Sequence, residues 1–369
     1  MIKKFAVKNY KSFKDEMFFD FTDFRDYKFN TFAIKNGLIK AAILYGKNGS
    51  GKSNFGLALF DLITHLTDNQ RSLEQSKNYI NGDSDEELAE FTYNFLIGEY
   101  EIQYMYKKQN VDKLVYETLV INDQKVFSFN FTTQKGDFPG MNYINAESLK
   151  IGESMNISVL RYIVYNANLN NDNIIVKLMN FINNMLWFRT TTSVNEYIGF
   201  DNGNHILTES IIEADKVKEF EKYLNKNEVN YKLNVKKDHL GKNILVAEYK
   251  YKDYNFIETA SNGTKALLLY FYWIQRLADA SFVFIDEYDA FFHTFLAQDL
   301  FLEITKKNKS QIIITTHNTD LMSNNILRPD CYFIMFKGKI KSLPNCTERE
   351  LREGHNLEKM FKGGEFGGR

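Results

Sequence analysis

The chain of 369 residues is long enough for one large domain or two ordinary ones. Its 46 lysines and arginines nearly balance 47 aspartates and glutamates, so the net charge of −1 gives no overall sign of a nucleic-acid partner. With only 3 prolines against 32 phenylalanines and 22 tyrosines, the composition excludes a largely disordered chain.

Cysteines and hydropathy indicate the compartment. Cys331 and Cys346 do not form a CxxC pair, which argues against a disulfide framework or a zinc site. The most apolar run, residues 266–274, is too short to cross a bilayer, and the lysines that follow Met1 interrupt any secretory segment. We therefore expect a soluble, cytoplasmic protein without a membrane partner.

The chain begins with a pattern typical of a nucleotide-binding domain. Residues 2–21 predict two strands around a turn near Lys14 and Asp15. A buried strand is expected at 41–45, and apolar residues at helical spacing predict a helix over 52–67.

The middle of the chain is less regular. Alternating polar and apolar residues between about 90 and 135 predict an antiparallel meander, and residues 146–190 are expected to be helical. A charged amphipathic helix is expected over 209–226, followed by strands at 229–237 and 243–251. We interpret residues 71–254 as an inserted α+β and helical region that provides partner or dimer contacts.

Core strands return near the carboxyl end. Residues 281–286 and 311–316 are continuous apolar runs typical of strands buried on both faces of a parallel sheet, with a crossover helix over about 290–306. We therefore expect an α/β head, a mixed sheet with helices on both faces, formed from residues 1–70 and 255–345. Residues 346–369 form a tail.

The stretch GKNGSGKSN, which follows the strand at 41–45, has the glycine, lysine and serine spacing of a phosphate-binding loop. Glycines allow backbone N–H groups to converge on an anion, and the helix after them points its positive dipole end at the same place. Lys52 would reach the β- and γ-phosphates, and Ser53 would bind Mg²⁺. The alternative is a glycine-rich turn without a ligand. The candidate nucleotide-binding residues of the loop are Gly46, Asn48, Gly49, Ser50, Gly51, Lys52, Ser53 and Asn54.

A pair of carboxylates follows the strand at 282–285. Asp286 would bind Mg²⁺ through water, and Glu287 is placed to accept a proton from an attacking water molecule. His317, which follows the next core strand, would meet a γ-phosphate at the same sheet edge. The alternative for the two acids is a solvated turn.

A second candidate anion site is the stretch SNGTK at 261–265, which precedes an apolar helix. Ser261 and Gly263 could bind a phosphate of a nucleotide shared between two protomers. The alternative is an ordinary capped helix.

The order GKNGSGKS, SNGTK, FVFIDE and TTH resembles the ABC-type ATPase head of the SMC, RecF and OLD families, and the opening FAVKNYKSFKD resembles their first strand. Within that group, DEYDAFFHTFL and the closing RPDCYFIMFKGK and LREGHNLEKMFKGGEFGG are most similar to stand-alone bacterial ATPases of the RloA/AbiL abortive-infection type. These features cover residues 1–67 and 255–369.

The resemblance implies roles for single positions. Lys52, Glu287 and His317 match the catalytic residues, and Ser53 and Asp286 match the residues that bind Mg²⁺. Lys11 and Ser12 match residues that approach the nucleotide from the first strand, while Ser261 and Gly263 match the signature motif that closes over the ATP of the opposite protomer. The signature lacks the leucine and second glycine of transporter versions.

Two further positions depart from the family pattern. His293 falls near the place of a dimer-contacting aspartate, where it would contact the opposite protomer or simply pack. The glutamine that couples the metal to a lever domain is not identifiable, and Gln103 is a weak candidate.

The function implied is an ATP-dependent dimeric switch, or a higher oligomer, with ATP and Mg²⁺ as cofactors. By resemblance, it would control a separately encoded nuclease or toxin in bacterial anti-phage defence. One alternative is a RecF-like DNA-binding protein in repair, and another is an ATP-gated scaffold that holds a toxin. DNA binding would use the lysines between 216 and 242, although the interspersed glutamates favour a solvated surface.

The tail offers no catalytic group. Its closing glycines argue against a packed helix at the end, and Phe361 and Phe366 could dock on a partner or on the head. The alternative is a flexible end with one anchoring turn.

Overall fold

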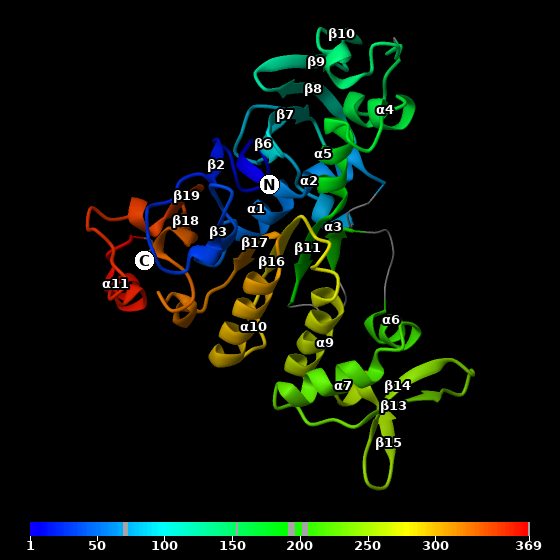
Figure 1. Cartoon of the computed structure of the whole chain (residues 1–369), viewed down its shortest axis with the longest axis vertical. Coiled ribbons are helices and arrows are strands. Elements are labelled where there is room, and N and C mark those ends of the chain that lie inside the picture. Colours follow the sequence, from blue (N-terminus) through cyan, green and yellow to red (C-terminus); the bar gives the residue numbers. More distant parts are fainter. Residues whose placement is uncertain (69–72, 153, 191–195, 201–205, 368–369) are drawn as a thin grey trace.

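The computed structural model describes residues 1–68, 73–152, 154–190, 196–200 and 206–367. Two seven-stranded sheets form the body of the protein, and a smaller unit of three strands and short helices lies beyond the helices that cover the second sheet (Figure 1).

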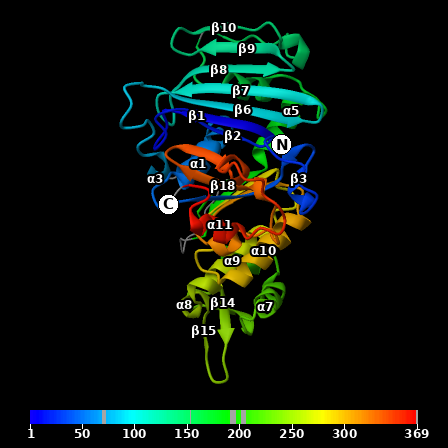
Figure 2. The same ribbon diagram turned by 90° about the vertical axis from the view of Figure 1, so that its left-hand side faces the viewer.

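The first sheet is antiparallel and has the order β10-β9-β8-β7-β6-β1-β2. Its strands are β1 (Ile2–Lys8), β2 (Met17–Asp20), β6 (Ala89–Ile97), β7 (Tyr100–Lys108), β8 (Leu114–Ile121), β9 (Gln124–Asn130) and β10 (Lys135–Asp137). Alternate side chains of β6 and β7 are buried, which is the pattern of strands with one face on a core. Figure 2 shows these strands stacked at one end of the molecule.

The second sheet positions the site and has the order β12-β11-β16-β17-β5-β18-β19. Its five inner strands run parallel, whereas β12 and β19 pair antiparallel at its edges. The strands are β5 (Ala41–Gly46), β11 (Met185–Arg189), β12 (Tyr197–Gly199), β16 (Phe282–Asp286), β17 (Gln311–Thr315), β18 (Tyr332–Phe336) and β19 (Lys339–Ser342). Strands β16 and β17 are buried along their whole length, as expected for parallel strands covered on both faces.

Helix α1 (Lys52–Leu59) lies between the two sheets. The ring of Phe55 contacts Phe5 and Phe19 of the first sheet and Phe284 of the second. Helices α2 (Asp61–Leu66) and α3 (Leu73–Ser76) follow α1, and α4 (Val159–Asn166) and α5 (Ile174–Asn183) come after the meander.

Helix α9 (Asn262–Ile274) covers the opposite face of the second sheet. Phe188 of β11 contacts Trp273 of this helix, whereas its neighbour Trp187 approaches Gly56 of α1. Since successive side chains of a strand point to opposite faces, α1 and α9 lie on different sides. Helix α10 (Thr294–Lys307) lies beside α9 (Figure 1).

The smaller unit contains β13 (Leu233–Lys237), β14 (Asn243–Glu248) and β15 (Asp253–Asn255), with α6 (Leu207–Glu213), α7 (Val217–Lys226) and α8 (Phe256–Thr259). Phe220 of α7 packs against Phe271 of α9, which joins the unit to the head. The helix expected over 209–226 is two helices with a break at 214–216.

The pairings place two segments of the expected insertion in the sheets of the head. Strand β6 pairs with β1, so the meander extends the first sheet. Residues 185–189, expected to continue a helix, form β11 in the second sheet. The expectation that residues 71–254 form a separate insertion is therefore corrected for these two segments. Strand β6 pairs with β1 and strand β11 pairs with β16, and both partners belong to the head.

The tail packs on the head and carries helix α11 (Leu357–Gly363), which ends at Gly364 in a left-handed conformation (φ 90°). The ring of Phe361 contacts Tyr45 of β5, and Phe366 is buried. Strands β3 (Ile34–Lys35) and β4 (Leu38–Ile39) form a separate small hairpin.

Candidate active site

The phosphate loop connects β5 to α1 and has a shape that requires glycine. Gly49 and Gly51 have φ values of 75° and 106°, in the left-handed region that favours glycine. A Cβ on Gly51 would lie 2.8 Å from the Oγ of Ser12, and one on Gly46 would lie 2.5 Å from the Oγ of Ser50. The loop is therefore compact, and a side chain at Gly46 or Gly51 would collide with Ser50 or Ser12.

Lys52 is buried and bonded within the loop. Its Nζ donates to the carbonyl oxygens of Gly46 at 2.8 Å and Lys47 at 3.3 Å. It also lies 3.0 Å from Nε2 of His317. Because an ammonium can only donate, Nε2 accepts and the imidazole is neutral with its proton on Nδ1.

The pKa values of both groups are lowered from their ordinary values. Burial lowers the pKa of Lys52, although the carboxylates of Asp286 and Glu287 oppose that shift. Removal from water, then the charge of Lys52, lowers the pKa of His317. The structure thus brings the sequence-predicted lysine and histidine together at one sheet edge.

The turn after β1 adjoins the phosphate loop, but only one of its two candidate residues faces the loop. Nδ2 of Asn54 donates to the Oγ of Ser12 at 3.0 Å. The ammonium of Lys11 instead donates to the carbonyl oxygen of Lys77 at 2.6 Å.

Asp286 ends β16 and is fully buried. The hydroxyl of Thr315 donates to its Oδ1 at 2.8 Å. Arg189, at the end of β11, donates to its Oδ2 from Nε at 2.9 Å and from Nη2 at 2.7 Å. Residues 185–189 form a parallel strand and not the expected helix, and this strand places Arg189 directly opposite Asp286, a partner that the sequence pattern does not indicate.

Glu287 has a φ of 52°, which is uncommon for a residue other than glycine. Its N–H donates to the hydroxyl of Thr315 at 2.8 Å, and the hydroxyl of Thr190 donates to its carbonyl oxygen. These bonds hold the backbone in a conformation that it would otherwise leave, a feature found at functional sites. The side chain is half-buried.

The SNGTK stretch begins α9. Ser261 caps the helix, because its Oγ accepts from the N–H of Thr264 at 3.1 Å. A Cβ on Gly263 would lie 3.2 Å from the carbonyl oxygen of Phe291. Since α9 and α1 cover opposite faces of the sheet, the motif begins a helix on the face opposite to α1.

The two remaining candidates lie apart from the acidic strand end. His293 precedes α10, is exposed and makes no capping hydrogen bond through its side chain. Gln103 lies on β7 of the first sheet, where it pairs with Asn94 and Val120, so it does not approach Asp286.

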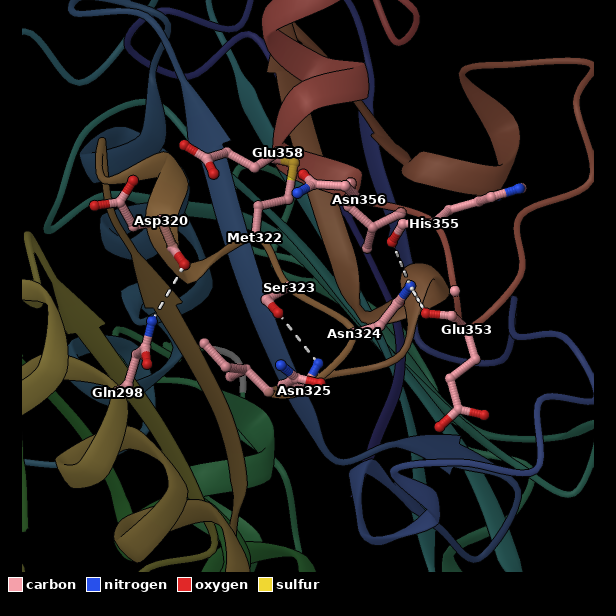
Figure 3. A pocket seen from close by; sticks show the side chains of 13 residues that line it. Gln298, Asp320, Met322, Ser323, Asn324, Asn325, Glu353, His355, Asn356 and Glu358 are labelled. Atoms are coloured by element: carbon pink, nitrogen blue, oxygen red, sulfur yellow. Dashed lines mark hydrogen bonds between the residues drawn. The ribbon is translucent and has the colours of Figure 1, made fainter.

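A pocket of about 370 Å³ lies between the loop that follows His317 and the tail (Figure 3). Nδ2 of Asn324 donates to the carbonyl oxygens of Glu353 at 2.9 Å and His355 at 3.0 Å, which fastens the tail to that loop. On the side of the pocket away from Asn324, the side-chain amide of Gln298 donates to the carbonyl oxygen of Asp320.

The residues present fit a nucleotide with Mg²⁺. The Oγ of Ser50 is buried without a hydrogen-bond partner inside the loop, a position that a phosphate oxygen would satisfy. The hydroxyl of Ser53 and the carboxylate of Asp286 are the oxygen ligands that Mg²⁺ prefers.

Residues 248–323 match the family described as "AAA domain, putative AbiEii toxin, Type IV TA system". No curated protein matches. The phosphate loop, the acidic strand end and the histidine lie at one edge of the adjoining parallel strands β5, β16 and β17. The fold is α/β, with helices on both faces of a largely parallel sheet.

Several solved structures are similar over most of the chain. The SMC head domain from Thermotoga maritima has a TM-score of 0.41 and 15% identity over 92% of this chain and 97% of that chain. An SMC head bound to the C-terminal winged-helix domain of ScpA gives 0.45 and 16% over 92% and 97%. The recombination mediator RecF with ATP gives 0.41 and 14% over 93% and 99%.

Proposed function

We propose that the chain binds ATP with Mg²⁺ and hydrolyses it, and that two chains close over two ATP molecules as a molecular switch. The observation that carries the proposal is the convergence of Lys52, Asp286, Glu287 and His317 at one edge of the parallel sheet. Ligands of open α/β sheets bind at the carboxyl ends of the strands.

The residues of this edge have distinct tasks. Lys52 exchanges the carbonyl oxygens of Gly46 and Lys47 for the oxygens of the β- and γ-phosphates, to which an ammonium bonds more strongly. Glu287 orients the attacking water and accepts its proton. Neutral His317 meets the γ-phosphate from the neighbouring strand. Mg²⁺, held through Ser53 and Asp286, would supply charge stabilisation for the leaving group.

The second protomer completes the site in this proposal. Ser261 and Gly263 begin α9, which covers the face of the sheet opposite to α1, and in this proposal they act on the nucleotide of the partner. His293 and Phe295, which is 76% accessible, lie at the start of α10, shortly after Phe291, whose carbonyl oxygen adjoins Gly263. In this proposal they extend the surface that would meet the second copy.

We infer that the switch controls a separately encoded nuclease or toxin in anti-phage defence. The description of the family matched by residues 248–323, which names a putative AbiEii toxin and a type IV TA system, supports this setting. Among the described residues, no cluster of histidines, cysteines and carboxylates is able to hold a further metal, and no helix has the length and hydropathy needed to cross a membrane.

A RecF-like role in DNA repair is the second candidate, and a toxin-holding scaffold is the third. The lysines between 216 and 242 are mostly paired with carboxylates in the described part of the chain, which favours a solvated surface. Ion pairs occur at Lys218, Lys226, Lys232, Lys236 and Lys242.

The proposed function is tested by hydrolysis and by binding together. Glu287→Gln should lower the ATP turnover rate by about 10²-fold or more, in the range of general-base catalysis, while ATP binding is retained. Lys52→Ala should abolish both ATP hydrolysis and ATP binding. Wild-type turnover in Glu287→Gln would contradict the assignment of the base, and absence of ATP binding by the wild-type protein would contradict the proposed function.

A further inference from the structure

Arg189 and Asp286 form an ion pair at the metal-binding end of the sheet. They are register partners of β11 and β16, and Nε and Nη2 of Arg189 both donate to Oδ2 of Asp286, at 2.9 and 2.7 Å. Because Thr315 bonds to Oδ1, both carboxylate oxygens already have protein donors. Asp286 is fully buried, so its charge needs a compensating cation.

Arg189 also faces a second carboxylate. Its Nη1 lies 3.7 Å from Oε2 of Glu196, and the amide of Gln75 donates to Oε1 of the same glutamate at 2.9 Å. The guanidinium lies over the ring of Trp187, 5.3 Å from its centroid. One guanidinium is therefore held between a fully buried carboxylate and a half-buried one.

We propose that Arg189 is a placeholder cation, which compensates Asp286 while the site lacks a metal and moves toward Glu196 when Mg²⁺ with nucleotide takes its place. The inference rests on the proposed function. A divalent cation held by Asp286, directly or through water, would repel a guanidinium bonded to the same carboxylate. Arg189 is a positioning residue here, because it acts on the metal through Asp286 and not on the reacting atoms.

The exchange sets the Mg²⁺ requirement of the site. Breaking the forked bond to Asp286 opposes metal binding, whereas the Glu196 carboxylate stabilises the displaced guanidinium. Removing Arg189 should therefore lower the Mg²⁺ concentration that nucleotide binding needs, and removing the charge of Glu196 should raise it.

The experiment is a Mg²⁺ titration of fluorescent ATP-analogue binding, at fixed analogue, for the wild type, Arg189→Gln, Arg189→Lys and Glu196→Gln. The midpoint of Arg189→Gln should fall about tenfold or more, which is the order expected for a charge-assisted hydrogen bond. Arg189→Lys, which keeps the charge without the fork, should lie between it and the wild type. The midpoint of Glu196→Gln should rise several-fold.

An unchanged or raised midpoint in Arg189→Gln would overturn the proposal, and so would a shift of the Glu196→Gln midpoint in the same direction as that of Arg189→Gln. If Arg189→Gln does not fold, Glu196→Gln decides. The side chain of Glu196 is only partly buried, so its substitution should be tolerated, and an unchanged Mg²⁺ midpoint in this variant overturns the proposal. Failure of the wild-type protein to bind the analogue at saturating Mg²⁺ is a different result, since it removes the proposed function itself.

Discussion

The contact between the phosphate-loop helix and the acidic strand depends on Gly56. A Cβ at this position would lie 2.6 Å from Cε1 of Phe284 on β16 and 2.8 Å from Nε1 of Trp187 on β11. Both rings are fully buried and have no space to yield. The change Gly56→Ala therefore pushes α1 away from the sheet.

Two opposing terms set the size of the effect. Alanine in the middle of a helix gains about 1 kcal/mol over glycine. Overpacking a filled core costs about 1–3 kcal/mol, and contact with two rigid rings places this site near the upper end. We expect a net loss of about 2 kcal/mol in the free energy of unfolding. Because Lys52 and Ser53 begin the same helix, ATP affinity should fall as well.

Urea unfolding measures this loss, with Gly354→Ala as the matched control. Gly354 is exposed and a Cβ there meets no atom within 4 Å, so its substitution should change stability by less than about 0.5 kcal/mol. If Gly56→Ala were as stable as the wild type or more stable, the reasoning about this contact would be refuted.

Three further changes test other parts of the structure. Lys108→Met should lower the free energy of unfolding by about 3–5 kcal/mol, because it breaks a buried ion pair in which the ammonium lies 3.1 Å from Oδ2 of Asp61. Combining it with Asp61→Asn should restore most of the loss in urea unfolding, and a loss below about 1 kcal/mol would contradict this reasoning. Burial is the main cause that lowers the pKa of His65 well below 6.5, and the charge of Lys108 adds to it. The neutral histidine therefore contributes fully to the stability of the fold above pH 6.5, and this contribution is lost as the pH falls below that value. The pH dependence of the melting temperature should therefore be flatter in His65→Gln, and an unchanged slope would exclude this residue as the cause. Gly51→Ala should weaken ATP-analogue binding at least about tenfold, since it combines a strained φ of 106° with a contact 2.8 Å from Ser12; an unchanged dissociation constant would show that the loop tolerates a side chain.

The parts of the site that could be predicted from the sequence are those determined by short, continuous sequence patterns. The strand, glycine-rich loop and helix of residues 41–59 occur within one continuous segment, and their residue types carry their own conformational requirements. Asp286, Glu287 and His317 each follow a short apolar run, so parallel pairing of β16 and β17 was enough to bring them to one edge.

The parts that sequence missed depend on pairings between distant segments. The meander joins the first sheet through contacts between β6 and β1, about eighty residues apart, which no local pattern records. The run MLWFR is apolar without a decisive period, and a short run of this kind is compatible with either a helix or a strand. The contact between Arg189 and Asp286 could not be predicted either, because it forms only when residues 185–189 are a strand beside β16.

The proposal that ATP closes two chains over shared sites is tested most directly by the mass of Glu287→Gln in solution, with and without Mg·ATP. We expect the mass to double, or to increase further, with Mg·ATP, and to remain that of a single chain when Lys52→Ala is added. A Glu287→Gln protein that binds ATP but keeps the mass of one chain would contradict the shared-site switch, and Ser261 would then be only the cap of α9.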